Sequence, residues 1–590
     1  MGNDVVIRRK ELLEEVLIKP ARSVLLVDDE YPTLDKMLSG YIDDGDVWSK
    51  SKAKAKDNAK RVSDIISYCR APERNWHVDV HDGENVSFKR EAETAQNLHQ
   101  SDLLFLDFHL DGDGNDPDKC LEILQHLADS DHFNLVVIVT KEDVQQTFNK
   151  VILKFLKPRF AKALDGELFG KVDTEIRDWS EDEETPFRTR LIESVSLDAL
   201  LRLPSVENLV YDSEEVISLL GGLTAILDKA PDDMDRNNAL KWALRIAEQE
   251  FSAKGSAEIE HSSLNSDQKW VCARNLFVTV VAKTEIDQGQ QIIDGLTNAL
   301  VVWNPTANRL MLIKLRSEIE ARGLSIGADL FAKKSMQALW LHGLITADEE
   351  RRLSDIDETV RRHGEALISL VAPSIRETIM KSLGMEEVVD ADDRILDSFG
   401  VDLRLPAVKE QAVLEHNIAV SNCDVRGWHL EPGHIFKYRG DHWLVLTPVC
   451  DLVPAQRRKR AAHLPGLMPF NAVKFRLLTQ NTKNILAKAD HNLTTFVETE
   501  TDPASLHFLT QDSSNSEVHW NEFFAKNRGK LGDANSIVIA TAESEDGESL
   551  KFEWESTEIC RQLRYEYAIN LMQILGARSA RIGLNFKKPN

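Results

Sequence analysis

The chain of 590 residues lacks several features that would define its class at once. No apolar run approaches the roughly 18 residues that a membrane-spanning helix needs. The charged segment 1–16 has no uninterrupted apolar core of the kind found in signal peptides. The six cysteines form no C-x-x-C pair, which argues for reduced thiols and against a structural zinc module. We therefore expect a soluble cytoplasmic protein.

Signatures of catalysis are missing as well. The sequence contains no P-loop, no G-x-S-x-G motif, no H-E-x-x-H motif and no dinucleotide-binding fingerprint. Whether the chain is an enzyme therefore stays open, and a non-enzymatic role is favoured.

The negative charge is unevenly distributed. The formal net charge is -25, yet residues 411–590 hold 21 basic and 21 acidic side chains and are neutral. The whole deficit lies in the first 410 residues. An acidic body disfavours non-specific binding to nucleic acid or to an anionic membrane, whereas the neutral C-terminal part could still carry a local basic patch.

Strand-like and helix-like segments alternate in the N-terminal part. Four apolar runs are typical of buried strands, and 117–129 between the last two carries a helical apolar stripe. This alternation predicts a parallel sheet wrapped by helices, with ligands outside the carboxyl ends of the strands. The runs are SVLLVDD (23–29), WHVDV (76–80), DLLFLDF (102–108) and FNLVVIVT (133–140), and the polar residues at their ends are Asp28, Asp29, Asp107 and Thr140.

These polar residues suggest a phosphoryl-transfer site. Three carboxylates at one sheet edge repel one another, and Mg2+ relieves that repulsion because carboxylates are its preferred ligands. With the metal bound, Asp107 could stay ionised and attack a phosphoryl donor while the metal neutralises charge on the transferring group. The hydroxyl of Thr140 could hydrogen-bond a phosphoryl oxygen.

The motifs VLLVDDE, LLFLDFHLDGDG and VVIVT together resemble the receiver domain of bacterial response regulators, over roughly residues 20–160. The resemblance implies a flavodoxin-like doubly wound sheet, Asp107 as phosphoacceptor, and Mg2+ held by Asp28, Asp29 and Asp107. It also implies a histidine kinase as phosphodonor, and that Thr140 moves to read the phosphorylation state. A degenerate receiver that has lost phosphotransfer is the alternative. The spacing from Asp29 to Asp107 is longer than receivers usually show, and we attribute it to an insertion near 40–75.

The site lysine is less certain from the sequence. Receivers place a Lys, usually followed by Pro, after the fifth strand, and Lys157 in VILKFLKP fits that pattern. However, residues 144–155 also carry a helical apolar stripe. If 142–157 is one helix, the fifth strand lies elsewhere and Lys141 is the nearest substitute. We favour Lys157 slightly.

The rest of the chain predicts two further domains, which gives a multidomain α/β + α + β architecture. The predicted boundaries are a receiver domain at 20–165, a helical domain at 190–400, and a β-rich domain at 411–590. Within the helical domain, 268–283 and 358–384 show apolar positions at helical spacing. In the last domain, 433–452 is typical of a hairpin across Gly440-Asp441, and 557–576 is predicted to be the final helix.

Three hypotheses for the output follow. In the first, the chain belongs to a two-component-type phosphorelay and acts through partner proteins, as a homodimer, or as a phosphate sink. Its architecture resembles the effector-less regulator of Detocs-type antiphage phosphorelays. In the second, the C-terminal part binds nucleic acid under phosphorylation control; in the third, it is an enzyme that depends on Cys450 and Asp451. The basic run that could contact nucleic acid is Arg457, Arg458, Lys459 and Arg460.

Overall fold

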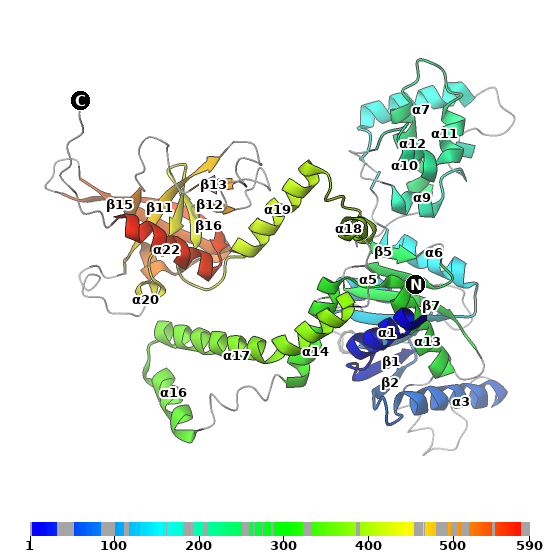
Figure 1. Ribbon diagram of the computed structural model, residues 1–590, viewed down its shortest axis with the longest axis horizontal. Helices are drawn as coiled ribbons and strands as arrows, with labels where there is room; N and C mark the ends of the chain where they lie inside the picture. Colours follow the sequence, from blue (N-terminus) through cyan, green and yellow to red (C-terminus); the bar gives the residue numbers. More distant parts are fainter. Residues whose placement is uncertain are drawn as a thin grey trace. The chain divides into compact units, whose positions relative to one another are not determined.

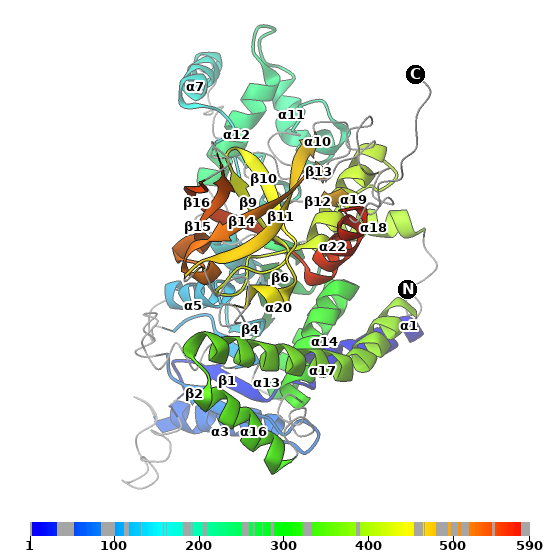
Figure 2. The same cartoon turned by 90° about the vertical axis from the view of Figure 1, so that its left-hand side faces the viewer.

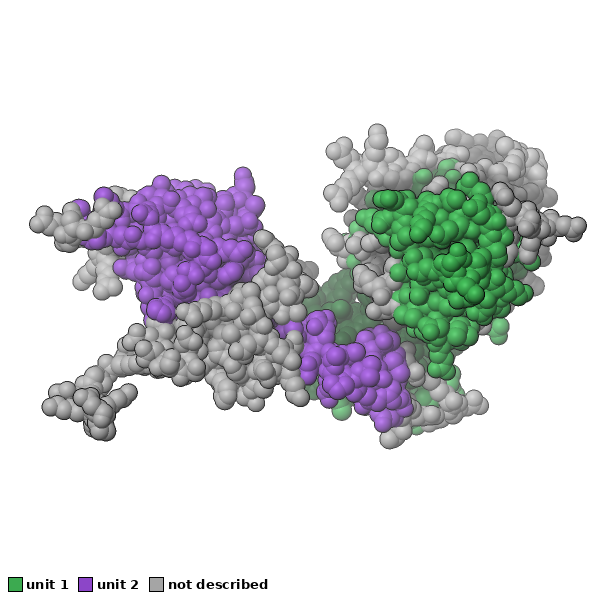
Figure 3. Space-filling model, turned by 90° about the horizontal axis from the view of Figure 1, so that it is seen from above, with its two compact units in different colours: residues 1–321, 373–387 green, residues 322–372, 388–590 purple. Residues whose placement is uncertain are grey.

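The computed structural model divides the chain into two units, residues 1–321 with 373–387 and residues 322–372 with 388–590 (Figure 3). Among the described residues, no helix is long and apolar enough to cross a membrane. The residues that the structure describes are 3–31, 52–83, 101–110, 117–130, 132–156, 159–160, 162–180, 190–191, 193–203, 209–250, 259–263, 266–273, 275–284, 288–322, 333–384, 390–453, 466–478, 494–496, 506–508, 519–544 and 549–579, with the single positions 33, 464 and 486.

The first unit is built on a seven-stranded sheet (Figure 1). Its strand order is β2-β1-β3-β4-β7-β6-β5, and the first five strands in that order are parallel. β6 and β5 continue the sheet in antiparallel fashion. The predicted parallel sheet is therefore confirmed, with two added strands at one edge. The strands are β1 (Ser23–Val27), β2 (His77–His81), β3 (Leu103–Asp107), β4 (Asn134–Thr140), β5 (Ile259–Ser263), β6 (Lys269–Ala273) and β7 (Leu276–Ala282).

Helices cover both faces of this sheet, which explains why β3 and β4 consist of continuous apolar runs that are buried along their whole length. One face packs against α1, η1, α3, α13 and α14, and the other against α5 and α6. The helices are α1 (Asn3–Leu13), η1 (Glu14–Ile18), α3 (Lys52–Cys69), α5 (Asp118–Ala128), α6 (Val144–Phe155), α13 (Gln288–Trp303) and α14 (Ala307–Arg322).

Two expectations about this unit are corrected. Residues 268–283 form strands β6 and β7 rather than a helix. A short run rich in valine and aromatic residues fits either structure, and here pairing with β4 decides the outcome. The stretch near 40–75, attributed to an insertion, contains α3, whose Val62, Ile65 and Cys69 are buried in the core of the sheet domain.

A helical bundle is inserted between α6 and β5. Its core gathers around the fully buried Trp242, whose indole N–H donates to Asp173 at 3.1 Å. The bundle confirms that the middle of the chain is largely helical. Its helices are α7 (Gly166–Ser180), α9 (Leu197–Arg202), α10 (Glu214–Leu219), α11 (Gly221–Leu227) and α12 (Arg236–Glu250).

The second unit contains a closed antiparallel barrel (Figure 2). The order β10-β9-β16-β15-β14-β11 closes because β10 also pairs with β11. Side chains alternate along β9, so that Phe436 points into the barrel core while Ile435 packs under α22. The strands are β8 (Asn422–Cys423), β9 (His434–Tyr438), β10 (Asp441–Val445), β11 (Met468–Leu478), β12 (Thr494–Phe496), β13 (Leu506–Phe508), β14 (Trp520–Ala525), β15 (Ser536–Glu543) and β16 (Lys551–Leu563).

The predicted β-rich domain with a final helix is confirmed, with two shifts. The hairpin turns at Arg439-Gly440, both at positive φ, which matches a tight two-residue turn. The final helix begins only at Tyr565, because the chain up to Leu563 pairs with β15 and then with β9 and β8 as β16. The remaining helices are α16 (Lys334–Thr346), α17 (Glu349–Gly384), α18 (Ala391–Phe399), α19 (Pro406–Ser421), α20 (Val449–Leu452), η5 (Lys526–Gly529), η6 (Asp533–Asn535) and α22 (Tyr565–Ser579).

Candidate phosphoryl-acceptor site

Four strands deliver polar residues to one edge of the first unit's sheet. Asp28 follows β1, Asp107 ends β3, Thr140 ends β4, and Lys283 follows β7. Because these strands are parallel and neighbouring, their carboxyl ends meet at the same edge, where open α/β sheets bind ligands. The sequence anticipated three of these positions; Lys283 was not anticipated.

The carboxylates form a compact cluster. Oxygen atoms of Asp28, Asp29 and Asp107 all lie within 4.8 Å of one another. Asp28 and Asp107 are only 6% and 8% exposed, so their charges are held largely away from water. Carboxylate oxygens are the ligand type that Mg2+ prefers, and the donor set therefore fits this ion. Among the described residues, this is the one group of acids, histidines or cysteines compact enough to hold a metal.

Lys283 is the cation at the centre of the site. Its Nζ lies 2.8 Å from Asp28 Oδ2 and 2.9 Å from Asp107 Oδ2, and its side chain is 3% exposed. Its backbone N–H donates to the carbonyl of Thr140 at 2.7 Å, as the pairing of β7 with β4 requires. Lys283 therefore occupies the place after the fifth parallel strand, for which the sequence predicts Lys157 or Lys141, and that prediction is corrected.

The electrostatics of the cluster reflect burial opposed by this lysine. Burial raises the pKa of Asp28 to about 6, although Lys283 pulls it down. Burial also raises the pKa of Asp107, against the same lysine. Burial alone would lower the pKa of Lys283, yet the carboxylates of Asp28 and Asp107 raise it above its ordinary value. Lys283 therefore stays charged, whereas burial opposes the ionisation of Asp28 and Asp107.

Of the two lysines proposed from the sequence, only Lys141 belongs to the described residues, and it lies at the rim of the carboxylate cluster. Lys157 is outside the described residues, and the segment before it is helix α6, not a strand. Lys141 is 57% exposed and its Nζ lies 2.8 Å from Glu30 Oε1. Glu30, which the sequence did not single out, also lies 3.6 Å from Lys283 through Oε2. Burial alone would raise the pKa of Glu30, but both lysines lower it on balance.

Thr140 is held inside the protein. It is 1% exposed, and its hydroxyl lies 3.3 Å from the hydroxyl of Thr147 on α6. The same oxygen accepts the backbone N–H of Glu142 at 3.0 Å. The hydroxyl thus has partners within its own loop and on α6.

The long insertion separates Thr140 from Lys283 along the chain. After β4 the chain forms α6 and then the helical bundle, and it rejoins the sheet as β5, β6 and β7. Arg159 and Phe160 lie just after α6. Their backbone N–H groups donate to the buried carboxylate of Glu248 on α12 at 2.8 and 2.9 Å. The bundle's last helix is thereby tied to the segment that follows α6.

The residues considered for other outputs form no comparable site among those that the structure describes. The run 457–460 lies outside the described residues. Cys450 is exposed on α20, with its thiol 3.7 Å from Asp451 Oδ1. On the preceding hairpin, His434 is buried and its Nδ1 accepts the N–H of Glu431, whereas the ring of His442 packs against Phe475.

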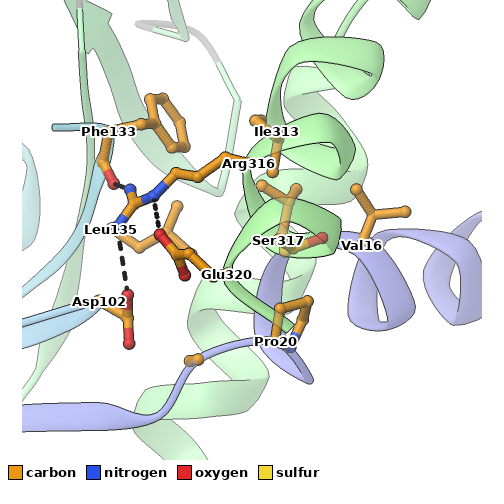
Figure 4. Close-up of a pocket in the computed structure, with 11 residues that line it drawn as sticks. Val16, Pro20, Asp102, Phe133, Leu135, Ile313, Arg316, Ser317 and Glu320 are labelled. Carbon is orange, nitrogen blue, oxygen red and sulfur yellow. Dashed lines mark hydrogen bonds and ion pairs between the residues drawn. The ribbon is translucent and has the colours of Figure 1, made fainter. Parts of the chain in front are cut away.

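A separate pocket lies at the opposite, amino end of the strands (Figure 4). Arg316 of α14 spans it and contacts Glu320 at 2.7 Å, the carbonyl of Phe133 at 3.1 Å and Asp102 at 3.5 Å. Asp102 also accepts the backbone N–H of Ser23 at 3.1 Å. These pairs join α14 to the start of the sheet and leave the guanidinium engaged by the protein itself.

A family model for the response receiver domain matches residues 20–186. These residues are therefore a receiver domain of the response-regulator family, and such a domain supports a response-regulator role for the chain. The match covers less than a third of the sequence and ends before β7, so Lys283 lies beyond it. No curated protein and no solved structure matches the chain.

Proposed function

We propose that the protein is the response regulator of a two-component-type phosphorelay and that Asp107 accepts the phosphoryl group. The observation that carries this proposal is the contact of Lys283 with Asp28 and Asp107 beside a compact group of three carboxylates. A buried cation and converging acids at the carboxyl edge of a parallel sheet are the parts that aspartyl phosphorylation needs.

The proposed chemistry uses an oxygen of Asp107 as nucleophile. It attacks the phosphorus atom of a phosphohistidine or of a small acyl phosphate; the new P–O bond forms as the bond to the donor breaks. Asp28, Asp29 and Asp107 would hold Mg2+, which supplies charge neutralisation to the transferring group when bound. Asp28, Asp29, Glu30 and Asp107 against Lys141 and Lys283 leave two negative charges, which matches the charge of that ion.

Lys283 and Thr140 would contact the transferred group. Lys283 already lies within hydrogen-bond distance of Asp107, so a phosphoryl group on Asp107 meets its ammonium without a large movement. Thr140 would have to exchange its contact with Thr147 for one with a phosphoryl oxygen. That exchange would change what α6 packs against, because Thr147 belongs to α6.

The phosphodonor would be a histidine kinase. The output would be protein interaction or phosphate storage, in which the receiver competes with another regulator for one kinase. A role in phage defence rests only on the resemblance of the architecture to effector-less regulators of antiphage phosphorelays.

The test is intact mass after incubation of the full chain with Mg2+ and acetyl phosphate. We expect one phosphoryl adduct on the wild type, none on Asp107→Asn, and an unchanged adduct on Asp79→Asn, an exposed acid of the same sheet. If neither acetyl phosphate nor a phosphorylated histidine kinase labels the folded wild type, the domain is a receiver that has lost phosphotransfer.

A further inference from the structure

Glu30 contacts both lysines at the edge of the site. Its Oε1 lies 2.8 Å from Lys141 Nζ and its Oε2 lies 3.6 Å from Lys283 Nζ. One carboxylate from the loop after β1 therefore bridges the ends of β4 and β7, the two strands that flank the insertion.

The backbone of Glu30 is fixed in this place. Its N–H donates to Asp28 Oδ1 at 2.9 Å, and its carbonyl accepts from Asn58 of α3 at 3.3 Å. Asn58 is buried, so the loop is held against the helix as well as against the carboxylate cluster. The side chain of Glu30, which is 28% exposed, is thereby presented to Lys141 from an anchored loop.

The two contacts differ in how readily they exchange. Lys283 is buried between Asp28 and Asp107, which leaves its longer contact with Glu30 secondary. Lys141 is more than half exposed, and an exposed ion pair is weak, so a stronger anion nearby would displace Glu30 from it. Lys141 also directly follows Thr140, the residue expected to approach the phosphoryl group.

We propose that Glu30 competes with the phosphoryl group on Asp107 for the ammonium of Lys141. In the unphosphorylated protein, Glu30 holds Lys141 at the rim; after transfer, Lys141 leaves Glu30 and pairs with a phosphoryl oxygen. The exchange makes and breaks no covalent bond. When water later attacks the phosphorus and the P–O bond to Asp107 breaks, inorganic phosphate departs and Lys141 returns to Glu30. Glu30 is in this sense a positioning residue that acts through Lys141 and shortens the life of the phosphorylated state.

This inference rests on the proposed function, and its test separates the two. The full-length protein is labelled with acetyl phosphate and Mg2+, the donor is removed, and loss of the adduct is followed by intact mass. The variants are Glu30→Gln, Lys141→Gln and the double variant; Lys141→Arg is the conservative rescue. Glu175→Gln is the matched control, because it removes the acid of an exposed Lys–Glu pair on α7.

We expect the effects of Glu30→Gln and Lys141→Gln on the adduct lifetime to be non-additive. Glu30→Gln should lengthen the adduct lifetime by about two- to fivefold, Lys141→Gln should shorten it, and Glu30→Gln should have no effect in the Lys141→Gln background. Lys141→Arg should restore the wild-type lifetime, and Glu175→Gln should leave it unchanged.

Four outcomes would overturn the proposal. An equal effect of Glu30→Gln with and without Lys141 would mean that Glu30 does not act through that lysine. A higher Mg2+ concentration for half-maximal labelling of Glu30→Gln would make Glu30 a metal ligand instead. No adduct on the wild type would remove the proposed function and this inference together, whereas a normal adduct with an unchanged lifetime in Glu30→Gln removes the inference alone.

Discussion

The ammonium of Lys283 lies 2.9 Å from the carboxylate of Asp107, although 176 residues separate them in the sequence. The chain leaves the sheet after β4, forms a helical bundle, and returns to place β7 beside β4. The receiver sheet is therefore completed by a strand that lies outside the segment matched by the family model. The insertion separates the site residues along the chain without separating them in space.

Replacing Lys283 by Gln should destabilise the first unit, because it leaves two buried carboxylates without their cation. We expect a loss of about 3 kcal/mol at neutral pH, as is typical when one partner of a buried pair is removed. The loss should shrink near pH 5, since Asp28, whose pKa is raised to about 6, is then protonated and no longer repels Asp107. Thermal unfolding at the two pH values measures this. Lys141→Gln is the control and should cost less than about 1 kcal/mol, because Lys141 is 57% exposed.

Much of the acid cluster was predictable from the sequence because each strand is a continuous apolar run that ends at a polar residue. Asp28, Asp107 and Thr140 could be placed at one edge from that pattern and the parallel topology alone. Lys283 could not, for two reasons. The segment 268–283 shows apolar positions at helical spacing as well as strand-like composition, and the pairing of β7 with β4 spans a long insertion. A useful signal was present, since VTVVAK ends a valine-rich run in a lysine.

The contacts of Glu30 could not be predicted from the sequence either. Glu30 looks like a third acid after Asp28 and Asp29, and only the fold brings Lys141 and Lys283 to its two oxygens. The closure of the barrel could not be predicted from the sequence either. The pairing of β10 with β11 depends on contacts that no local sequence pattern encodes.

Binding of Mg2+ should weaken as the pH falls through about 6. Burial raises the pKa of Asp28 to about 6, so below that pH the carboxyl carries a proton that the metal must displace. We expect an affinity that is nearly constant above about pH 7 and falls by up to about tenfold per pH unit below the pKa. Calorimetric titration of the full chain with MgCl2 at pH values on both sides of about 6 measures this change in affinity. A pH-independent affinity would show that Asp28 does not hold the ion.

The same shift affects stability in the metal-free protein. Because the folded pKa of Asp28 lies above its unfolded value of 3.8, the folded state retains a proton between pH 4 and 6 that the unfolded state releases. The contribution of Asp28 to stability therefore falls as the pH rises through this window. Asp28→Asn should flatten that part of the pH profile and stabilise the protein above it by about 1–2 kcal/mol. Urea unfolding across the window measures both effects, and an unchanged profile would contradict the shift.

Glu248 should be needed for the insertion to stay anchored behind α6. Its carboxylate is 3% exposed and accepts the N–H groups of Arg159 and Phe160. Glu248→Gln replaces one accepting oxygen by an amide that donates, which leaves a buried N–H facing another N–H and should cost about 1–3 kcal/mol. Hydrogen exchange should speed up at Phe160 and along α12. Glu193→Gln, at an exposed position of the same bundle, is the control and should leave exchange unchanged.

Two glycines of the barrel should respond differently to the same substitution. Gly433 and Gly440 both have positive φ, at 91° and 80°, so alanine strains the backbone at either position. At Gly440 the added methyl would meet open space, and we expect a loss of about 1 kcal/mol. At Gly433 the added methyl would lie 2.6 Å from the carbonyl oxygen of Leu563 and 3.3 Å from Ala568. The start of β9 therefore packs too closely against β16 and α22 to admit a side chain. Gly433→Ala should therefore lower the free energy of unfolding of the barrel far more than Gly440→Ala, by about 3 kcal/mol in all. Denaturant unfolding of the full chain, followed by tryptophan fluorescence, compares the two variants. Equal losses would show that backbone strain alone, and not this close approach, determines the cost of alanine at Gly433.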